Sequence, residues 1–255
     1  MAATLSLLGI IKADKGDISQ AIALHEQSLA INEQIGYLPG IATTLSQLGM
    51  LKADNGEISQ AIALNEKSLA INEQIGNLKG KAANLHQLGT LKADNGDISQ
   101  AIDLYEQSLA INKQIGNVRD QAATLHNLGG IKADKGEISE AIALYKQSIS
   151  FNEQVGNLQG KAATLYKLMC LKGNNREIEE AIALFQQSLA IKKIGNVQSQ
   201  AITLSYLGRI AEQQHNYNQA LYYLQLALEI LQRIQSPDAE EVRQMVVRVQ
   251  DLIRN

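Results

Sequence analysis

The chain has 255 residues, of which 45% are hydrophobic and 19% are charged, and its formal net charge is −3. These proportions are typical of a folded protein rather than a disordered one, and the balance of charges gives no basic surface for nucleic acid or an anionic membrane. The single cysteine, Cys170, excludes an internal disulfide and fits a reducing compartment, so we expect a cytoplasmic protein.

The N-terminal segment MAATLSLLGII aligns with IATTLSQLGML at 41–51 and is therefore the first helix of a repeat, not a signal peptide. The same alignment continues along the chain in steps of 40 residues, with residues 85–117 as the representative stretch. No run approaches the ~20 apolar residues of a membrane span, so we expect no membrane partner. A chain that repeats one unit end to end is predicted to be a solenoid.

Each unit is predicted to form two helices. In the third copy the first helix runs from about Lys81 to Asn95, and Gly96 ends it in a left-handed conformation. Asp97 is predicted to cap the second helix, which runs from about Ile98 to Ile115. The second helix carries two apolar stripes, because an inner member of a stack packs on two sides.

Small residues recur at fixed places on both helices and indicate close helix packing. The first helix carries Leu8-Gly9, Leu48-Gly49, Leu88-Gly89 and Leu128-Gly129, and the second carries Ala21, Ala61, Ala101, Ala141 and Ala181. Four residues after each alanine stand His25, Asn65, Tyr105, Tyr145 and Phe185. This pattern resembles the tetratricopeptide repeat. The period of 40 instead of about 34 is similar to the long repeats of kinesin light chains, partner-of-inscuteable proteins and bacterial, notably cyanobacterial, multidomain proteins.

Besides its period, the chain departs from that family's pattern on the first helix. A leucine replaces the aromatic residue that often opens this helix throughout the first five copies. An aromatic residue usually stands three positions after the glycine of the first helix, where this chain has Lys12, Lys52, Lys92, Lys132 and Lys172. These lysines must reach solvent or a carboxylate, and we expect the neighbouring aspartates to be their partners. The fifth copy has Met169 for the glycine and lacks one residue in its loop at 191–196, which is expected to change the angle to the next unit.

The resemblance implies an all-α, right-handed α-solenoid of six helical hairpins and a C-terminal capping helix. The repeats are predicted at about 1–40, 41–80, 81–120, 121–160, 161–199 and 200–235, and the capping helix at 236–255. Ser236 is the expected cap of that helix, and its packed face is predicted to hold Val242, Met245, Val246, Val249, Leu252 and Ile253. No equivalent cap precedes Met1, so we expect either a fragment of a longer protein or self-association through the N-terminal end.

No motif in the chain organises a catalytic, metal or cofactor site. GNLKGK at 76–81 and GNLQGK at 156–161 are one residue shorter than a phosphate loop and follow helices, not strands. DNGD at 94–97 lacks the alternating acidic ligands of a calcium loop. His86 and His126 lie on first helices that are roughly 10 Å apart, too far to share a zinc ion easily. We therefore predict a protein that is not an enzyme and has no cofactor.

The resemblance implies that the first helices line a concave groove that binds a protein or peptide. The predicted groove residues are Ser46, Met50, Asp54, His86, Thr90, Asp94, His126, Asp134, Tyr166, Cys170 and Arg209. Their row of aspartates favours a basic partner. The alternative is that lysines and aspartates pair along the helices and bind nothing. Two other functions stay open, a sensor or regulatory arm of a larger bacterial signalling or peptidase protein, and a self-assembling structural repeat.

Overall fold

The computed structural model describes residues 1–172 and 197–254, and every regular element within these ranges is an α-helix. The helices are α1 (Ala2–Asp14), α2 (Ile18–Gln34), α3 (Leu38–Asp54), α4 (Ile58–Gln74), α5 (Leu78–Asp94), α6 (Ile98–Gln114), α7 (Val118–Asp134), α8 (Ile138–Gln154), α9 (Leu158–Lys172), α11 (Val197–Gln213), α12 (Tyr217–Arg233) and α13 (Asp238–Arg254). Residues 173–196, with Ala181 and Phe185, lie outside the described residues. The chain divides into two compact units, residues 1–13 with 18–156 and residues 14–17 with 157–255.

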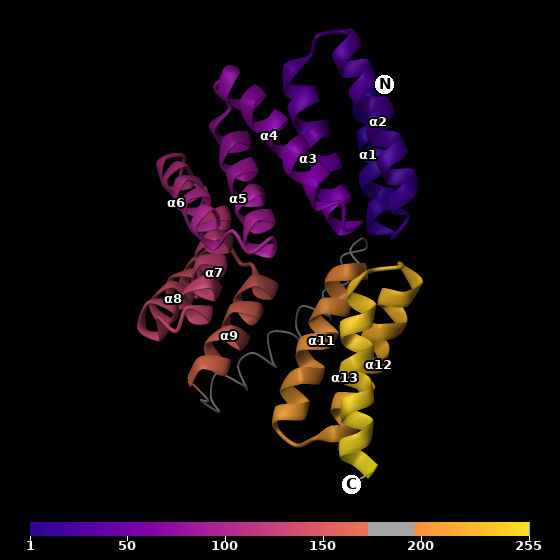
Figure 1. Cartoon of the computed structure of the whole chain (residues 1–255), viewed down its shortest axis with the longest axis vertical. Helices are drawn as coiled ribbons and strands as arrows, with labels where there is room; N and C mark the ends of the chain where they lie inside the picture. Colours follow the sequence, from indigo (N-terminus) through magenta and orange to yellow (C-terminus); the bar gives the residue numbers. More distant parts are fainter. Residues whose placement is uncertain (173–196, 255) are drawn as a thin grey trace. The chain divides into compact units, whose positions relative to one another are not determined.

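The first unit is a stack of helical hairpins, which confirms the predicted all-α solenoid (Figure 1). We call α1, α3, α5 and α7 the A helices and α2, α4, α6 and α8 the B helices. Each of α3, α5 and α7 packs against the B helix that follows it and against the B helix that precedes it. Every inner helix therefore contacts helices on two sides, as the two apolar stripes of the B helix predict.

Two predicted details of the third hairpin differ in the structure, the start of its first helix and the cap of its second helix. Helix α5 begins at Leu78, not Lys81, because the side chain of Asn77 accepts a hydrogen bond from the amide of Gly80 and caps the added turn. Asp97 precedes α6, but its side chain makes no capping hydrogen bond, since it accepts from Asn95 and pairs with Lys92 instead. The predicted left-handed turn is confirmed, because Gly96 has φ +86°.

A glycine on each A helix lies against one side chain of the partner B helix. A Cβ atom placed on Gly89 would stand 2.9 Å from the ring of Tyr105, closer than packed atoms approach each other. Both residues are buried, and Tyr105 is only 2% exposed. The ring therefore fills the volume that a larger A-helix residue would need, which explains the Leu-Gly signature.

A buried ladder of serines joins the two helices of every hairpin in the first unit. Each serine donates its hydroxyl to the carbonyl of the alanine 26 residues earlier. The four pairs are Ser28 to Ala2, Ser68 to Ala42, Ser108 to Ala82 and Ser148 to Ala122, at 2.7–2.9 Å. Since these hydroxyls are buried and paired, they stabilise the hairpin at a position where the tetratricopeptide pattern usually has alanine.

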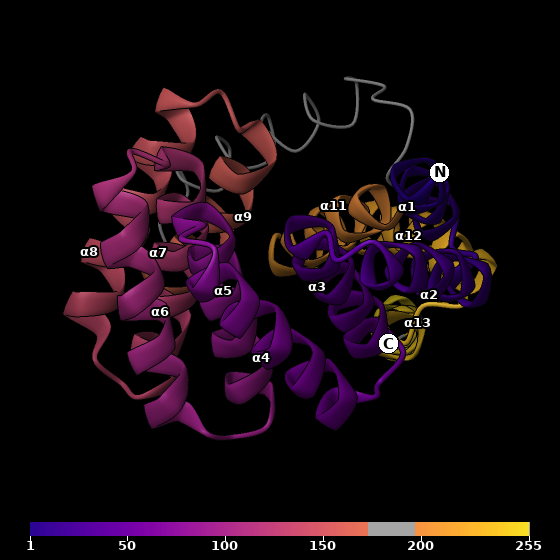
Figure 2. The ribbon, with the colours of Figure 1, turned by 90° about the horizontal axis from the view of Figure 1, so that it is seen from above.

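The A helices lie on the inner side of the curve that the first unit follows. Figure 2 shows α3, α5 and α7 inside and α4, α6 and α8 outside. Neighbouring A helices also touch directly, α3 with α5 and α5 with α7. Side chains of successive A helices can therefore form one continuous surface.

In the second unit, α11 and α12 form a hairpin that α13 covers. Val242, Met245, Val246 and Val249 are buried against α12, as predicted, but Leu252 and Ile253 are 41% and 42% exposed, so the predicted packed face ends one turn early. The hydroxyl of Ser236 accepts a hydrogen bond from the amide of Asp238, which confirms its capping role. Helix α13 is therefore the expected cap of this unit.

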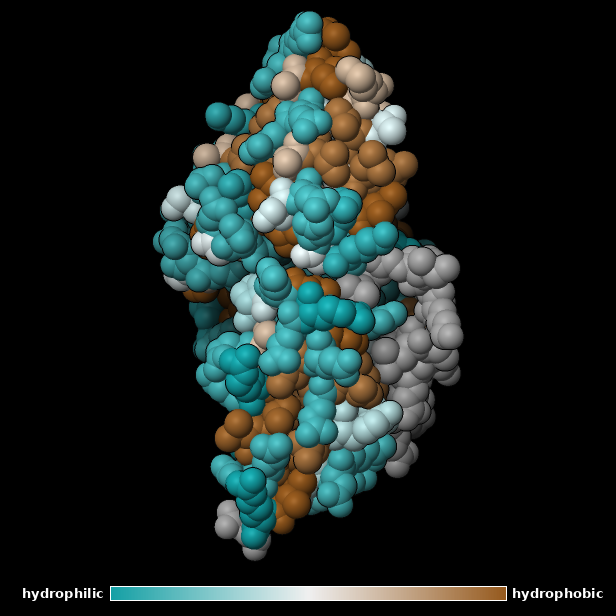
Figure 3. Space-filling model, turned by 90° about the vertical axis from the view of Figure 1, so that its right-hand side faces the viewer, coloured by the Kyte–Doolittle hydropathy of each residue, from teal (hydrophilic) through white to brown (hydrophobic). Residues whose placement is uncertain are grey.

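Helix α1 keeps its apolar face exposed. Leu8 is 44% exposed, whereas the equivalent Leu48 on α3 is 3% exposed beneath the preceding B helix. Met1, Leu7, Ile10 and Ile11 are exposed as well, and Figure 3 shows hydrophobic surface over this hairpin. Across residues 1–172 and 197–254, no helix is both long and apolar enough to cross a membrane.

Candidate binding groove

A cavity of 420 Å³ opens between α3, the start of α4 and α5. It brings together five predicted groove residues, Met50, Asp54, His86, Thr90 and Asp94. The other lining residues are Gly49, Ala53, Ile58, Asn65, Gln87 and Leu91. The lining combines apolar side chains such as Met50, Ile58 and Leu91 with two exposed carboxylates at the ends of α3 and α5, so the cavity can hold an apolar side chain beside a positive charge.

The cavity exists because Asn65 takes the place that tyrosine has in the next two repeats. Asn65 folds back on its own helix, where its amide nitrogen donates to the carbonyl of Ala61 at 2.9 Å. One repeat later, the hydroxyl of Tyr105 extends to 2.9 Å from Oγ1 of Thr90. It also accepts a hydrogen bond from Asn127 at 3.1 Å. Tyrosine thus fills a space that asparagine leaves open. Burial raises the pKa of Tyr105, so the phenol stays neutral.

His86 is held by the framework of the groove. Thr124 gives its hydroxyl proton to the carbonyl of Asp120, so its oxygen accepts from Nδ1 of His86 at 3.0 Å. Nε2 of the same ring then accepts from Asn127 at 3.4 Å. Burial lowers the pKa of His86, outweighing the opposite effect of Asp120, so the imidazole is neutral near pH 7. Its ring also contacts that of Tyr105 in a tilted arrangement, with centroids 5.3 Å apart and an interplanar angle of 59°.

Hydrogen bonds between successive A helices recur at a spacing of 41 residues, which the sequence analysis missed. The pairs are Ser6 with Gln47 at 2.8 Å, Ser46 with Gln87 at 3.0 Å and His86 with Asn127 at 3.4 Å. The recurrence of Gln47, Gln87 and Asn127 directly after the predicted groove position is the signal that could have revealed them. Ser46 and His86 therefore link successive A helices through their side chains.

Three A-helix lysines pair with acidic residues around the start of the following B helix, and the predicted aspartate partner is found for Lys92 alone among these three. Lys52 lies 3.0 Å from Glu57, and Lys92 lies 3.8 Å from Asp97. Lys132 pairs with Glu137 and Glu140, whose hydrogen bonds raise its pKa. Hydrogen bonds from Asn55 and Lys52 lower the pKa of Glu57. The aspartates on the groove, Asp54, Asp94 and Asp134, are all exposed.

Of the other predicted residues whose side chains the structure describes, none lines this cavity; they are Ser46, His126, Asp134 and Arg209. The His126 ring lies 5.7 Å from that of Tyr145. Arg209 belongs to the second unit, where it pairs with Glu241 at 4.0 Å and lines a separate cavity of 350 Å³. Tyr166 and Cys170 are in α9, but their side chains lie outside the described residues.

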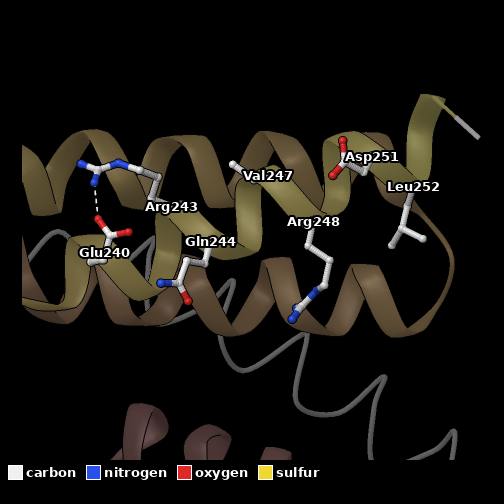
Figure 4. A pocket seen from close by; sticks show the side chains of 7 residues that line it. All are labelled: Glu240, Arg243, Gln244, Val247, Arg248, Asp251 and Leu252. Atoms are coloured by element: carbon white, nitrogen blue, oxygen red, sulfur yellow. Dashed lines mark hydrogen bonds and ion pairs between the residues drawn. The ribbon is translucent and has the colours of Figure 1, made fainter.

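A shallow cavity along α13 has a volume of 490 Å³, larger than the cavity between α3 and α5. All seven residues that line it come from one face of one helix (Figure 4). Arg243 pairs there with Glu240, and Arg248 forms two hydrogen bonds of 2.7 Å with Glu212. A single helix face encloses no ligand, so the A-helix cavity is the better candidate. In the part of the chain that the structure describes, no group of three His, Cys, Asp or Glu residues could hold a metal ion.

A model of the tetratricopeptide repeat family matches residues 1–74, 40–114, 80–154, 120–194 and 162–233. Among solved structures, BtubC (BKLC) from P. vanneervenii is 16% identical, with 93% of this chain and 92% of that chain covered and a TM-score of 0.58. The Rap conjugation gene regulator of plasmid pLS20, solved with the Phr* peptide, is 15% identical, with 92% and 63% covered and a TM-score of 0.70.

Aspartyl phosphate phosphatase F from Bacillus subtilis is 12% identical, with 93% of this chain and 61% of that chain covered and a TM-score of 0.70. This chain therefore spans less than two thirds of the length of the Rap regulator and of the phosphatase. At these identities the likeness concerns the fold alone. The comparison with curated proteins found no match. The overlapping matches of the family model together cover residues 1–233, and the chain therefore belongs to the tetratricopeptide repeat family.

Proposed function

We propose that the first unit binds a peptide or helix of a protein partner in the groove lined by its A helices, and that it catalyses no reaction. The observation that carries this proposal is the cavity between α3 and α5, which side chains from three helices line. The Rap regulator of plasmid pLS20, which has a similar fold, was solved with a bound peptide, which supports the proposal.

The partner segment is basic. Asp54, Asp94 and Asp134 recur at one end of successive A helices and are exposed there. The lysines of the same helices pair with acidic residues around the start of the B helices. Asp54 interacts with another residue of the chain, and the exposed carboxylates of the three aspartates give this end of the A helices negative charge. Such a row accelerates association with a positively charged segment and fixes its register.

The test removes the negative charge of the row. We expect the variant with Asp54→Asn, Asp94→Asn and Asp134→Asn to lose the basic partners that the wild type captures from a lysate, while its circular dichroism stays unchanged. The matched control makes three neutral changes on exposed positions of the outer B helices, Glu66→Gln, Asp103→Asn and Glu106→Gln. Equal capture by the groove variant and the wild type would contradict the proposal.

A second candidate function is self-association through α1, whose apolar face is exposed where equivalent residues of α3 are buried. Light scattering over a range of concentrations tests it. We expect the variant with Leu7→Glu and Ile11→Lys to stay monomeric at concentrations where the wild type associates. A wild type that is monomeric at every concentration would rule this function out.

A further inference from the structure

The deepest part of the groove lies where the repeats differ most, at Asn65. The backbone of α3 and α4 matches that of α5 and α6 in helix length and turn geometry, and both A helices have a glycine facing this position. In the third hairpin a phenol ring covers Gly89. In the second hairpin the shorter amide of Asn65 covers Gly49 and leaves a space that opens into the groove.

We infer that this cavity receives an aromatic side chain of the partner, and that a lysine or arginine next to it in the partner's sequence faces Asp54 and Asp94. The inference rests on the proposed function and adds the chemistry that the groove selects. The partner would supply the ring that the second repeat lacks.

The residues around the cavity fit a ring better than a polar or charged group. Met50 is 50% exposed at its mouth, and Ile58 and Leu91 add apolar surface beside the neutral polar side chains of the lining. A thioether makes favourable contacts with the edge of an aromatic ring. Met50 and Gln87 occupy the positions that Thr90 and Asn127 have one repeat later, where those two side chains bind the hydroxyl of Tyr105. Phenylalanine and tyrosine are therefore both acceptable, because the thioether replaces a hydrogen-bonding hydroxyl.

The negative charge of the cavity rim determines which residue of the partner is favoured next to the aromatic side chain. Asp54 and Asp94 end α3 and α5, and both line the same cavity. Asp54 also interacts with a residue of the chain itself, so the basic residue of the partner adds to an existing interaction. A cation adjacent to the ring places its charge close to both carboxylates, whereas an acidic neighbour would be repelled.

The probe is an array of decapeptides in a Gly-Ser background. Each peptide carries phenylalanine, tyrosine, leucine or alanine, followed by lysine, arginine, glutamate or serine. We expect the wild type to bind the aromatic–basic peptides on the order of tenfold more tightly than the alanine–basic ones. It should bind the aromatic–glutamate peptides least.

Asn65→Tyr is the decisive variant, because it places in the second repeat the residue that the third and fourth repeats already accommodate. We expect it to keep its helical circular dichroism and to lose the aromatic preference. Met50→Thr introduces at the mouth of the cavity the residue that α5 has at the equivalent position, Thr90. This variant tests the inference if Asn65→Tyr does not fold, and it should weaken the preference for aromatic peptides. The double variant Asp54→Asn with Asp94→Asn should lose the preference for lysine and arginine and keep the preference for a ring.

The outcomes separate this inference from the proposed function. If folded Asn65→Tyr or Met50→Thr selects aromatic peptides as strongly as the wild type, the cavity is not the aromatic site, while groove binding stands. A preference for glutamate beside the ring would overturn the assigned charge. If the wild type binds none of the peptides, the inference fails, and the lysate experiment on the aspartate row decides the proposed function by itself.

Discussion

The second and third hairpins have A and B helices of the same length, and they differ in what their B helix places against the A-helix glycine. In the third hairpin Tyr105 fills the interior and its hydroxyl closes the gap between α5 and α7. In the second, Asn65 satisfies its amide on Ala61 and leaves a cavity of 420 Å³. A tyrosine in one unit and an asparagine at the same position of another thus leave different volumes inside hairpins of the same fold.

The largest effect on stability is expected for Tyr105→Asn, which gives the third hairpin the residue that the second hairpin has at this position. Truncating this buried ring should lower the free energy of unfolding by about 3 kcal/mol, because the packing on Gly89 and two hydrogen bonds are lost. Urea unfolding followed by circular dichroism measures the effect. Tyr105→Phe keeps the ring and should cost only about 1 kcal/mol; equal losses for the two variants would mean that the ring contributes little.

The next test concerns the glycine on the other side of the contact. Gly89→Ala places a methyl group 2.9 Å from the Tyr105 ring, and this overpacking should cost about 1–2 kcal/mol despite the better helix propensity of alanine. The control is Gly130→Ala, whose methyl group would meet nothing nearer than the Tyr145 hydroxyl at 3.7 Å. That change should stabilise the helix by about 0.5–1 kcal/mol. Thermal unfolding of both variants compares the signs, and a stabilised Gly89→Ala would refute the close contact.

The smallest effect comes from the first hairpin, which has His25 at the same position. His25 is 1% exposed, burial lowers its pKa below the ordinary 6.5, and its Nδ1 has no hydrogen-bond partner among the described residues. Below pH 6.5, His25 therefore binds a proton in the unfolded chain but not in the folded chain. The free energy of unfolding falls as the pH is lowered, until the pH reaches the lowered pKa of the folded state.

The melting temperature measured from pH 7 downward tests this effect of His25. Replacement by the residue of the second hairpin, His25→Asn, should make the decline shallower between pH 6.5 and the lowered pKa. His86 keeps part of the decline, because burial lowers its pKa as well. An identical pH profile for the variant and the wild type would show that His25 is not buried in solution.

The sequence predicts the hairpins and their order because the repeated glycines, alanines and leucines each have one role in the packing. Gly96 and Ser236 do what their types predict. Asp97 does not, since Lys92 and Asn95 compete for its carboxylate, and a local rule for helix caps does not include such partners. The groove positions follow from the family pattern, and five of them meet in one cavity. The cavity itself depends on the three-dimensional volume beside Asn65, which no spacing rule contains.

The hydrogen bonds between successive A helices allow a whole repeat to be removed without loss of the contact. Each bond joins a residue of one unit to the next position of the following unit, as Ser6 with Gln47 and Ser46 with Gln87. Deleting residues 41–80 would set Ser6 opposite Gln87, which is again a glutamine. Loss of this unit therefore preserves the junction between the first and the following A helix. Such an array can lose this unit in a single deletion, with no compensating substitution at the new junction.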